Sequence, residues 1–541
     1  MKLNLTKPAG ILARVGLSAI ALLVALAMAF LFIGCMLGTA DMSIDNPMKE
    51  LVIFEKDSLL QNIGWLLLYV CLAGGLTFAL HHLGWLKRLT VWHLALGLFI
   101  WILLAGCVWV ISAMSSPTHD SLIVTRAGVS AALGEMKYLQ EDYFIRFPFQ
   151  SGYVLWTEIW ARLFKLGHGG YLFMEFVNVI CLALGEVALL LTTDKLFSRR
   201  EITFATALAL AAFFQPIIFS TFLYGTIPGF CFAAWAIYFF IRYLKGNKWW
   251  FIALSGVFLI IAVSLKLNNM ILLVAMGIIL VAHLLRGKPL RRFLALILLC
   301  VSVMTLTNVA KWQYEARLDK DLGDGIPMIS WMAMGLHEAP PAPGWYDGKY
   351  TVTNFHASGN DPDVAGEKSK EVIKTRLSYF ADNPKEAAEF FRDKILSQWS
   401  ETTYQSLWNN QVRGHYIPMF GVAKYACEDG EDTVKDLMDL GVQFLYCGML
   451  IAAVYLFISQ IKKEKDRPED QAGLFLIPLL FLGGFLYHAL FEAKSQYVIT
   501  YVTFMIPYAI WGFASLSRSV KWLIDRISNR IHSKKKERPI T

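Results

Sequence analysis

One polar stretch carries residues that could do chemistry at a membrane surface. It spans residues 115–152, directly after a long apolar run, and it places Asp120 close to the end of that run. The acid pair Glu141 and Asp142 follows, and Arg146 stands among aromatic residues. Polar chain between membrane spans must lie in water or line a cavity. The stretch is therefore either a solvated loop or one wall of an active site, and its own residues fit both interpretations equally.

The elements that must position these residues are membrane helices. The chain has 541 residues, of which 56% are hydrophobic and 17% are charged, and its mean hydropathy is +0.48. The apolar residues fall in runs of about 20, the length that a helix needs to cross the hydrocarbon core. The short alternating segments of a membrane β-barrel do not occur in the sequence. We predict an all-α polytopic membrane protein.

The sequence indicates about twelve transmembrane helices. The expected spans are residues 15–37, 62–83, 91–113, 171–192, 202–221, 227–243, 250–264, 269–285, 293–308, 438–459, 473–489 and 497–516. The first apolar run is too long for a cleaved signal peptide, so we expect it to remain as a span.

The basic clusters between these spans predict the orientation. When the N-terminus is placed inside, every cluster falls on the same side, as the positive-inside rule requires. This arrangement makes both termini cytoplasmic and places residues 115–152 and 311–435 outside, together with the short turns that carry Lys266 and Lys494. The net charge of +8 then serves orientation in the cell membrane, and no nucleic-acid partner is expected.

These spans suggest a division of the chain into five parts. They are two additional N-terminal helices (1–90), a transmembrane core (91–310) with its first outer loop (114–170), an extracytoplasmic domain (311–436), the C-terminal helices (437–516) and a basic amphipathic cytoplasmic tail (517–541). Residues 153–169 form an amphipathic, tryptophan-rich segment. We expect there a helix that either lies in the membrane interface or packs inside the protein.

The second outer region is rich in aromatic and amide side chains. Flat apolar rings beside hydrogen-bonding groups are the chemistry of a carbohydrate-binding surface, and also ordinary packing. The candidate sugar-binding residues are Trp345, Tyr404 and Trp408.

Several segments, in order along the chain, resemble the GT-C membrane glycosyltransferases, which include protein O-mannosyltransferases and lipid A aminoarabinose transferases. They are Asp120 after a span, YFIRFPFQSG (143–152), YGTIPGF (224–230), SLKLNN (264–269) and FEAKSQYVITYVTFMIP (491–507). Two departures are clear. The usual acid pair of the first loop is a single Asp120 preceded by His119, and Lys494 or Gln496 stands in place of the late arginine.

The resemblance implies transfer of a hexose or pentose from a polyprenyl-phosphate donor, such as undecaprenyl phosphate, to an acceptor outside the cell membrane. The implied general base is Asp120. The residues expected to bind the donor phosphate are Arg146, Lys266 and Lys494, and those expected to orient the acceptor are Glu141, Asp142 and His119. The acceptor would be a cell-envelope glycan, teichoic acid or protein, with a cell-wall glycan or teichoic acid preferred.

No cofactor or metal is expected, because the outer regions show no HxH pattern and the resemblance implies a branch of GT-C enzymes that generally works without one. Three other classes of protein remain open at this point. A secondary transporter fits the number of spans, although the sequence shows no internal repeat. A polysaccharide polymerase or ligase would use similar lipid-linked sugars, and a non-catalytic scaffold would need no acid at Asp120.

Overall fold

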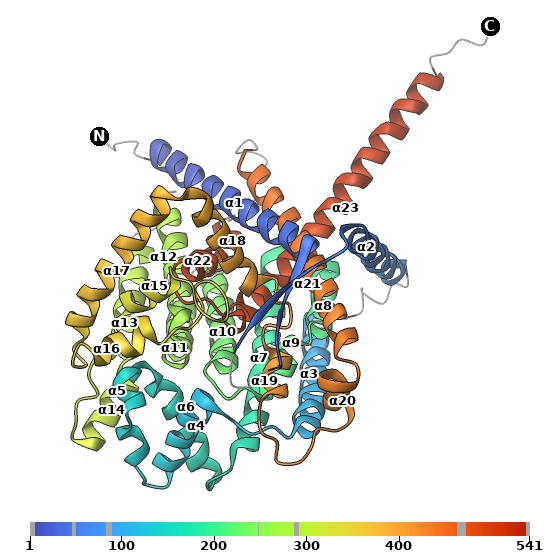
Figure 1. Ribbon diagram of the computed structural model, residues 1–541. Coiled ribbons are helices and arrows are strands. Elements are labelled where there is room, and N and C mark those ends of the chain that lie inside the picture. Colours follow the sequence, from blue (N-terminus) through green and yellow to red (C-terminus); the bar gives the residue numbers. More distant parts are fainter. Residues whose placement is uncertain are drawn as a thin grey trace.

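The computed structural model describes residues 6–45, 50–82, 89–246, 248–285, 291–461 and 472–536. These residues form a helical bundle with one small hairpin, in which β1 (Gly38–Met42) pairs antiparallel with β2 (Val52–Lys56). Figure 1 shows the bundle, from which the C-terminal half of α23 (Ile499–Lys536) extends away. The predicted all-α polytopic membrane fold is confirmed.

Within the described residues, nine helical segments are long and apolar enough to cross a membrane. They contain α1 (Thr6–Leu37), α3 (Val91–Ala113), α7 (Tyr171–Phe197), α10 (Thr226–Gly246), α12 (Met270–Leu285), α13 (Arg291–Leu306), α21 (Glu431–Ile461), α22 (Leu476–Leu490) and α23. The helices α8 (Arg200–Ala212) and α9 (Gln215–Ile218) form a tenth segment that is bent by 44°. The remaining expected spans fall on α2 (Leu59–His82) and α11 (Trp249–Leu265), whose apolar parts are shorter.

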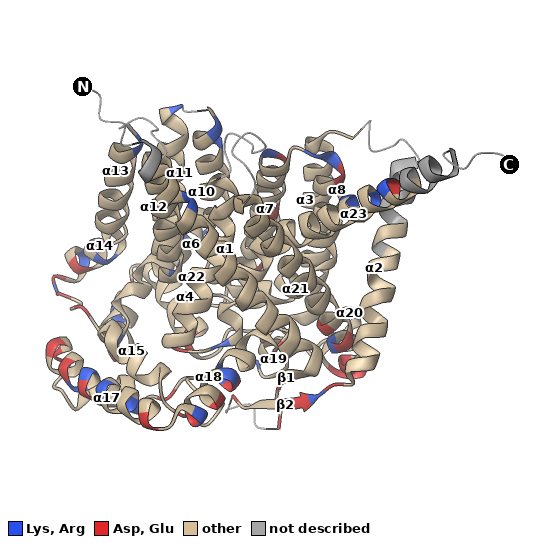
Figure 2. Ribbon diagram, turned by 90° about the horizontal axis from the view of Figure 1, so that it is seen from above, with Lys and Arg blue, Asp and Glu red and all other residues tan. Residues whose placement is uncertain are grey.

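A layer of short helices covers one end of the bundle. It contains α4 (His119–Ala132), α5 (Asp142–Arg146), α6 (Ser151–Phe164), α14 (Val309–Leu318), α15 (Met328–Gly335), α16 (Asn354–His356), α17 (Pro362–Asp382), α18 (Pro384–Trp399), α19 (Ser406–Gln411) and α20 (Gly421–Lys424). Figure 2 shows α17, α18 and the β hairpin at the opposite end of the molecule from the basic residues near α8. Of the basic clusters used to predict orientation, Lys87, Arg88, Arg286, Lys288 and residues 462–470 lie outside the described residues.

The first outer loop and the second outer region share one apolar core. Val124 and Phe144 from the first region pack in the same cluster as Tyr314 and Phe355 from the second. An ion pair between a buried acid and a more exposed arginine reinforces this contact, since Arg317 Nη1 lies 2.8 Å from Glu158 Oε2. The two regions, distant in sequence, therefore form one continuous layer.

Helix α6 combines the two arrangements that its sequence left open. Val154 and Ala161 are buried, while Ile159, Leu163 and Phe164 are exposed. The buried face packs against α4 and α14. The exposed apolar face is suited to contact with lipid.

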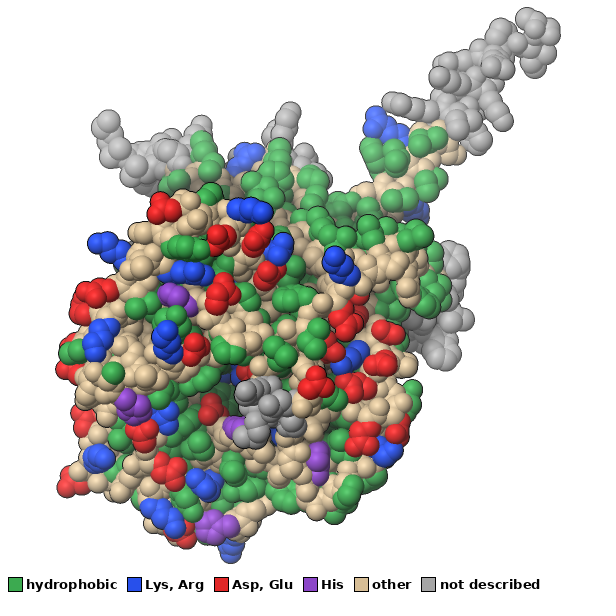
Figure 3. All heavy atoms as spheres, in the orientation of Figure 1, with side chains coloured by type: hydrophobic (Ala, Val, Ile, Leu, Met, Phe, Trp, Pro, Cys, Tyr) green, Lys and Arg blue, Asp and Glu red, His purple; other side chains and the backbone are tan. Residues whose placement is uncertain are grey.

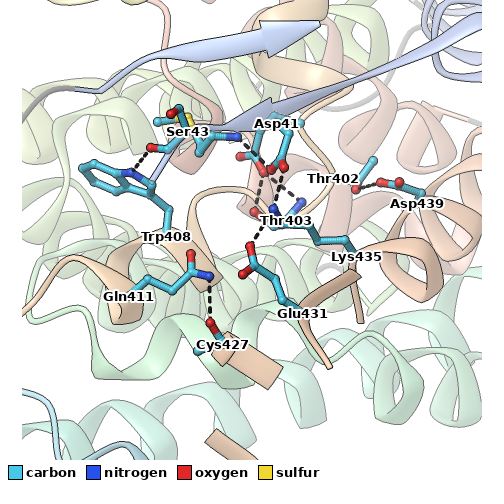
Figure 4. Close-up of polar contacts among 12 residues, drawn as sticks. Asp41, Ser43, Thr402, Thr403, Trp408, Gln411, Cys427, Glu431, Lys435 and Asp439 are labelled. Atoms are coloured by element: carbon cyan, nitrogen blue, oxygen red, sulfur yellow. Dashed lines mark hydrogen bonds and ion pairs between the residues drawn. The ribbon is translucent and has the colours of Figure 1, made fainter. Parts of the chain in front are cut away.

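The β hairpin is fixed to the outer layer by polar contacts (Figure 4). Lys435 Nζ lies 2.5 Å from the Asp41 carboxylate, and Trp408 Nε1 donates a hydrogen bond of 3.1 Å to the Ser43 carbonyl. The backbone N–H of Ala40 donates to the Ser400 carbonyl at 3.1 Å. The hairpin thus has a defined position against α18, α19 and α21.

Candidate active site

Asp120 lies in the first turn of α4, where the helix dipole favours a negative charge. Its side chain keeps access to solvent, yet protein surrounds it on most sides. Both observations hold for a side chain that protein surrounds without covering it. Figure 3, which labels no residues, shows a hollow in the middle of the face drawn. Burial raises the pKa of Asp120, whereas the positive charges of Lys494, His119, Lys266 and Arg146 act to lower it.

The structure therefore brings Asp120 within electrostatic range of all three cations expected to bind the donor phosphate. We use the name "charged recess" for this site. Its ionisable members are Asp120, Arg146, Lys266, Glu492 and Lys494.

Lys266 follows the last residue of α11 and lies between two tyrosine rings. Its Nζ is 4.5 Å from the centre of the Tyr224 ring and 4.9 Å from that of Tyr497, within the range of a cation–π interaction. Burial lowers the pKa of Lys266 to about 8, and Glu492 and Asp120 act in the opposite direction. A buried ammonium held in this way is a strong electrostatic partner for an anion.

Two glycines allow the Lys266 turn to pack against neighbouring backbone. A Cβ at Gly152 would lie 1.8 Å from the Ser264 carbonyl oxygen, and one at Gly225 would lie 1.8 Å from that of Leu265. No side chain fits at such distances. The segments QSG, YGTIPGF and SLKLNN, which carry part of the family resemblance, therefore meet in space and position Lys266.

Lys494 lies in the turn between α22 and α23. Its Nζ is 2.5 Å from the carboxylate of Glu50, and both side chains are largely buried. Two residues earlier, Glu492 accepts a hydrogen bond of 3.1 Å from the Tyr497 hydroxyl. Burial raises the pKa of Glu492 to about 7, and Glu50 adds to this shift, while Lys494 opposes it.

The buried amine of Lys394 in α18 holds this turn in place. Its Nζ donates to the Phe491 carbonyl at 2.7 Å and also to the Gly335 carbonyl. The backbone N–H of Ala493 donates to the Gly344 carbonyl at 2.8 Å. The second outer region thus determines where Glu492 and Lys494 lie.

Arg146 is oriented by one member of the predicted acid pair. Asp142 lies 2.9 Å from the Arg146 guanidinium and 3.5 Å from His356. Glu141 instead faces Arg126, at 3.4 Å. His119, exposed at the start of α4, directly precedes Asp120.

The three candidate sugar-binding residues lie in the packed interior. Trp345 and Tyr404 have no exposed surface, and Trp408 is 8% exposed. The indole of Trp345 donates to Ser397 at 2.8 Å, and that of Trp408 bonds to the hairpin (Figure 4). All three rings are enclosed by protein, so they present no open stacking face.

The neighbouring Tyr346 is the exposed aromatic residue at the charged recess. It is 40% exposed. Burial raises its pKa, and the charges of Glu492 and Asp120 raise it further, so its hydroxyl lies within electrostatic range of these acids.

Sequence reasoning did not assign roles to Glu50, Glu492 or the two tyrosines beside Lys266. Glu492 could have been found, because it lies two positions before Lys494 in the FEAKSQY segment. Glu50 gave no such signal, since it precedes the strand β2, far from Lys494 in sequence. Among the described residues, no group of three or more His, Cys, Asp or Glu side chains could hold a metal ion.

Residues 148–312 match the family model of dolichyl-phosphate-mannose-protein mannosyltransferase. The chain carries a GT-C glycosyltransferase domain. The matched segment contains Gly152, Tyr224, Gly225 and Lys266, and thus the parts that build the Lys266 side of the charged recess. No curated protein matches the chain.

The match indicates the class of activity. The chain is a multi-pass membrane protein with the domain of a GT-C glycosyltransferase that uses a polyprenyl-phosphate sugar. This finding favours glycosyl transfer over the transport and scaffold alternatives.

Proposed function

We propose that the charged recess transfers a sugar from polyprenyl phosphate to an acceptor hydroxyl on the extracytoplasmic face of the membrane. The observation that carries this proposal is the convergence on Asp120 of Arg146, Lys266 and Lys494, which come from three separate segments. A carboxylate beside several cations at the end of a helix bundle combines the two groups that this reaction needs.

Asp120 acts as the general base in this proposal. Its carboxylate takes the proton from the acceptor hydroxyl as the oxygen attacks the anomeric carbon of the donor. The bond between that carbon and the phosphate oxygen breaks, and its electron pair remains on the phosphate. The products are the glycosylated acceptor and polyprenyl phosphate, with the proton on Asp120.

The cations stabilise the charge that develops on the leaving phosphate. Lys266 and Lys494 are both deeply surrounded by protein, so little water screens their charge. Arg146 adds a planar guanidinium that can bind two phosphate oxygens, and Asp142 holds it in orientation.

The acceptor is a hydroxyl of a cell-envelope glycan, a teichoic acid or a protein. Tyr346 supports this assignment, because its exposed ring lies within electrostatic range of the acids of the recess and can stack against a sugar or peptide. No cofactor takes part, since the donor carries its own activated phosphate ester.

The first experiment compares Asp120→Asn with the wild type in proteoliposomes. The full chain is supplied with polyprenyl-phosphate hexoses or pentoses and with membrane acceptors, and the transfer of labelled sugar is measured. We expect a loss of at least about 100-fold in Asp120→Asn, the size typical of a lost general base.

Asp363→Asn is the matched control, because Asp363 is an exposed acid at the start of α17. We expect it to retain wild-type transfer. Full activity in Asp120→Asn at equal protein level would exclude Asp120 as the base. Partition of the label between glycan, teichoic acid and protein fractions identifies the acceptor.

A further inference from the structure

Glu50 forms an ion pair with Lys494, one of the cations that are expected to bind the donor phosphate. Its carboxylate lies 2.5 Å from Lys494 Nζ, and the exposed fractions of the two side chains are 19% and 17%. The amide of Gln405 donates a second hydrogen bond to Glu50, at 3.3 Å. A carboxylate is the protein group most similar to a phosphate in charge and in its acceptor oxygens.

The chain that follows Glu50 has a fixed position. Val52, two residues later, is buried in a cluster with Trp345, Trp408 and Ala493. Its backbone N–H donates to the Pro341 carbonyl at 3.2 Å. Ala493 is the residue between Glu492 and Lys494, so the hairpin and the Lys494 turn pack directly against each other. The contact between Glu50 and Lys494 is therefore built into the fold.

The carboxylates around Lys494 oppose the binding of a further anion at this cation. Glu50, Glu492 and Asp120 all act on Lys494 and raise its pKa against the effect of burial. A phosphate brings at least one more negative charge into the same recess. Like charges at this range repel strongly where water is scarce, so a bound phosphate and the Glu50 carboxylate compete for one ammonium group.

We propose that Glu50 is an internal counter-anion, which pairs with Lys494 when the site is empty and is displaced by the donor phosphate, so that it sets the donor affinity. Glu50 acts through Lys494 and is thus a positioning residue. The proposal rests on the proposed function, because it assigns Lys494 to the donor phosphate. It gives a role to the N-terminal hairpin, which precedes the segment matched by the family model.

The test measures the binding of undecaprenyl phosphate to the full chain in lipid nanodiscs. Glu50→Gln keeps the size of the side chain and its hydrogen bond to Gln405 but removes the competing charge. We expect it to bind the probe about 5- to 50-fold more tightly than the wild type, the range of a typical coupling between two sites. Glu55→Gln is the control, since Glu55 is an exposed acid of the same hairpin.

A double-mutant cycle with Lys494→Met separates this role from a structural one. If Glu50 acts through Lys494, the gain from Glu50→Gln disappears in the Lys494→Met background. Unchanged or weaker binding in Glu50→Gln would overturn the proposal, as would an equal gain in Glu55→Gln. Thermal unfolding of each variant confirms that the hairpin remains folded.

The same measurements separate failure of the inference from failure of the proposed function. If Glu50→Gln changes nothing while Lys494→Met weakens binding, the inference is wrong and the phosphate site stands. If the wild type, Lys266→Met and Lys494→Met all bind the probe equally poorly, the assignment of the phosphate site is wrong as well.

Discussion

At the scale of single residues, burial in the charged recess shifts acids and bases in opposite directions. It raises the pKa of Asp120 and Glu492 and lowers that of Lys266, because an environment with little water penalises either charge. A carboxylate with a raised pKa is a stronger base, while an ammonium with a lowered pKa can lose its proton near neutral pH. Burial thus defines both the acidic and the alkaline limit of the working pH range.

The dependence of kcat/KM on pH is the first prediction. Transfer should fall as pH decreases through the raised pKa of Asp120, since the base becomes protonated. It should also fall as pH rises above about 8, where Lys266 loses its charge. Lys266→Arg keeps the charge at all accessible pH values. In this variant the fall of kcat/KM on the alkaline side should therefore begin at a higher pH. An unchanged descending limb in this variant would show that another group causes it.

At the scale of elements, the recess is assembled from turns held by close backbone packing. The Lys266 turn depends on Gly152 and Gly225. The Lys494 turn depends on the buried Lys394 and on Gly344. None of these residues needs to touch a substrate, yet each determines where a charged group lies.

Gly225→Ala tests the first of these turns. Its Cβ would lie 1.8 Å from the Leu265 carbonyl oxygen, so the Lys266 turn must move by roughly an ångström, which can reduce catalysis by about 100-fold. Gly167→Ala should be neutral, because nothing lies within 4 Å of its Cβ. Sugar transfer by the purified variants is the measurement, and equal activity of the two would contradict the expectation.

Lys394→Met tests the second turn. The substitution keeps the apolar stem but leaves the carbonyls of Gly335 and Phe491 without their shared donor. Two unsatisfied buried acceptors should cost about 2–4 kcal/mol of stability. The matched control is Lys385→Met on the same helix, since the Lys385 side chain is 89% exposed. Thermal unfolding in detergent should show a lower midpoint for Lys394→Met alone. Equal midpoints of the two variants would exclude the role of Lys394 in stabilising the Lys494 turn.

At the scale of the whole molecule, the two ends of the bundle differ in architecture, and most acidic residues lie at one of them (Figure 2). The outer layer and hairpin lie at one end, and basic residues near α8 lie at the other (Figure 2). We propose that the outer layer faces the extracytoplasmic side and that both termini face the cytoplasm. The first outer loop and the second outer region then act as one cover over the bundle, and the charged recess forms where this cover meets the Lys266 and Lys494 turns.

Labelling of single introduced cysteines tests this orientation. Asn360→Cys, before α17, should react with a membrane-impermeant maleimide in intact cells. Lys248→Cys, before α11, should react only after the membrane is opened. Both positions are exposed, and the unsubstituted chain controls for its eight native cysteines. The reverse pattern would place the recess on the cytoplasmic side.

The sequence by itself located the apolar runs, the acid near the end of one run and the basic residues of two turns. About twelve spans were expected, and the described residues contain nine or ten helical segments that are long and apolar enough to cross a membrane. These features are local, because a bilayer requires about 20 consecutive apolar residues and Asp120 follows such a run directly. Only the tertiary structure decided which charges meet. The contact of Glu50 with Lys494 joins the N-terminal and C-terminal parts of the chain, and no local sequence pattern encodes it. The packing under the hairpin likewise buries Trp345 and leaves Tyr346 at the recess, a difference between adjacent aromatic residues that depends on long-range contacts alone.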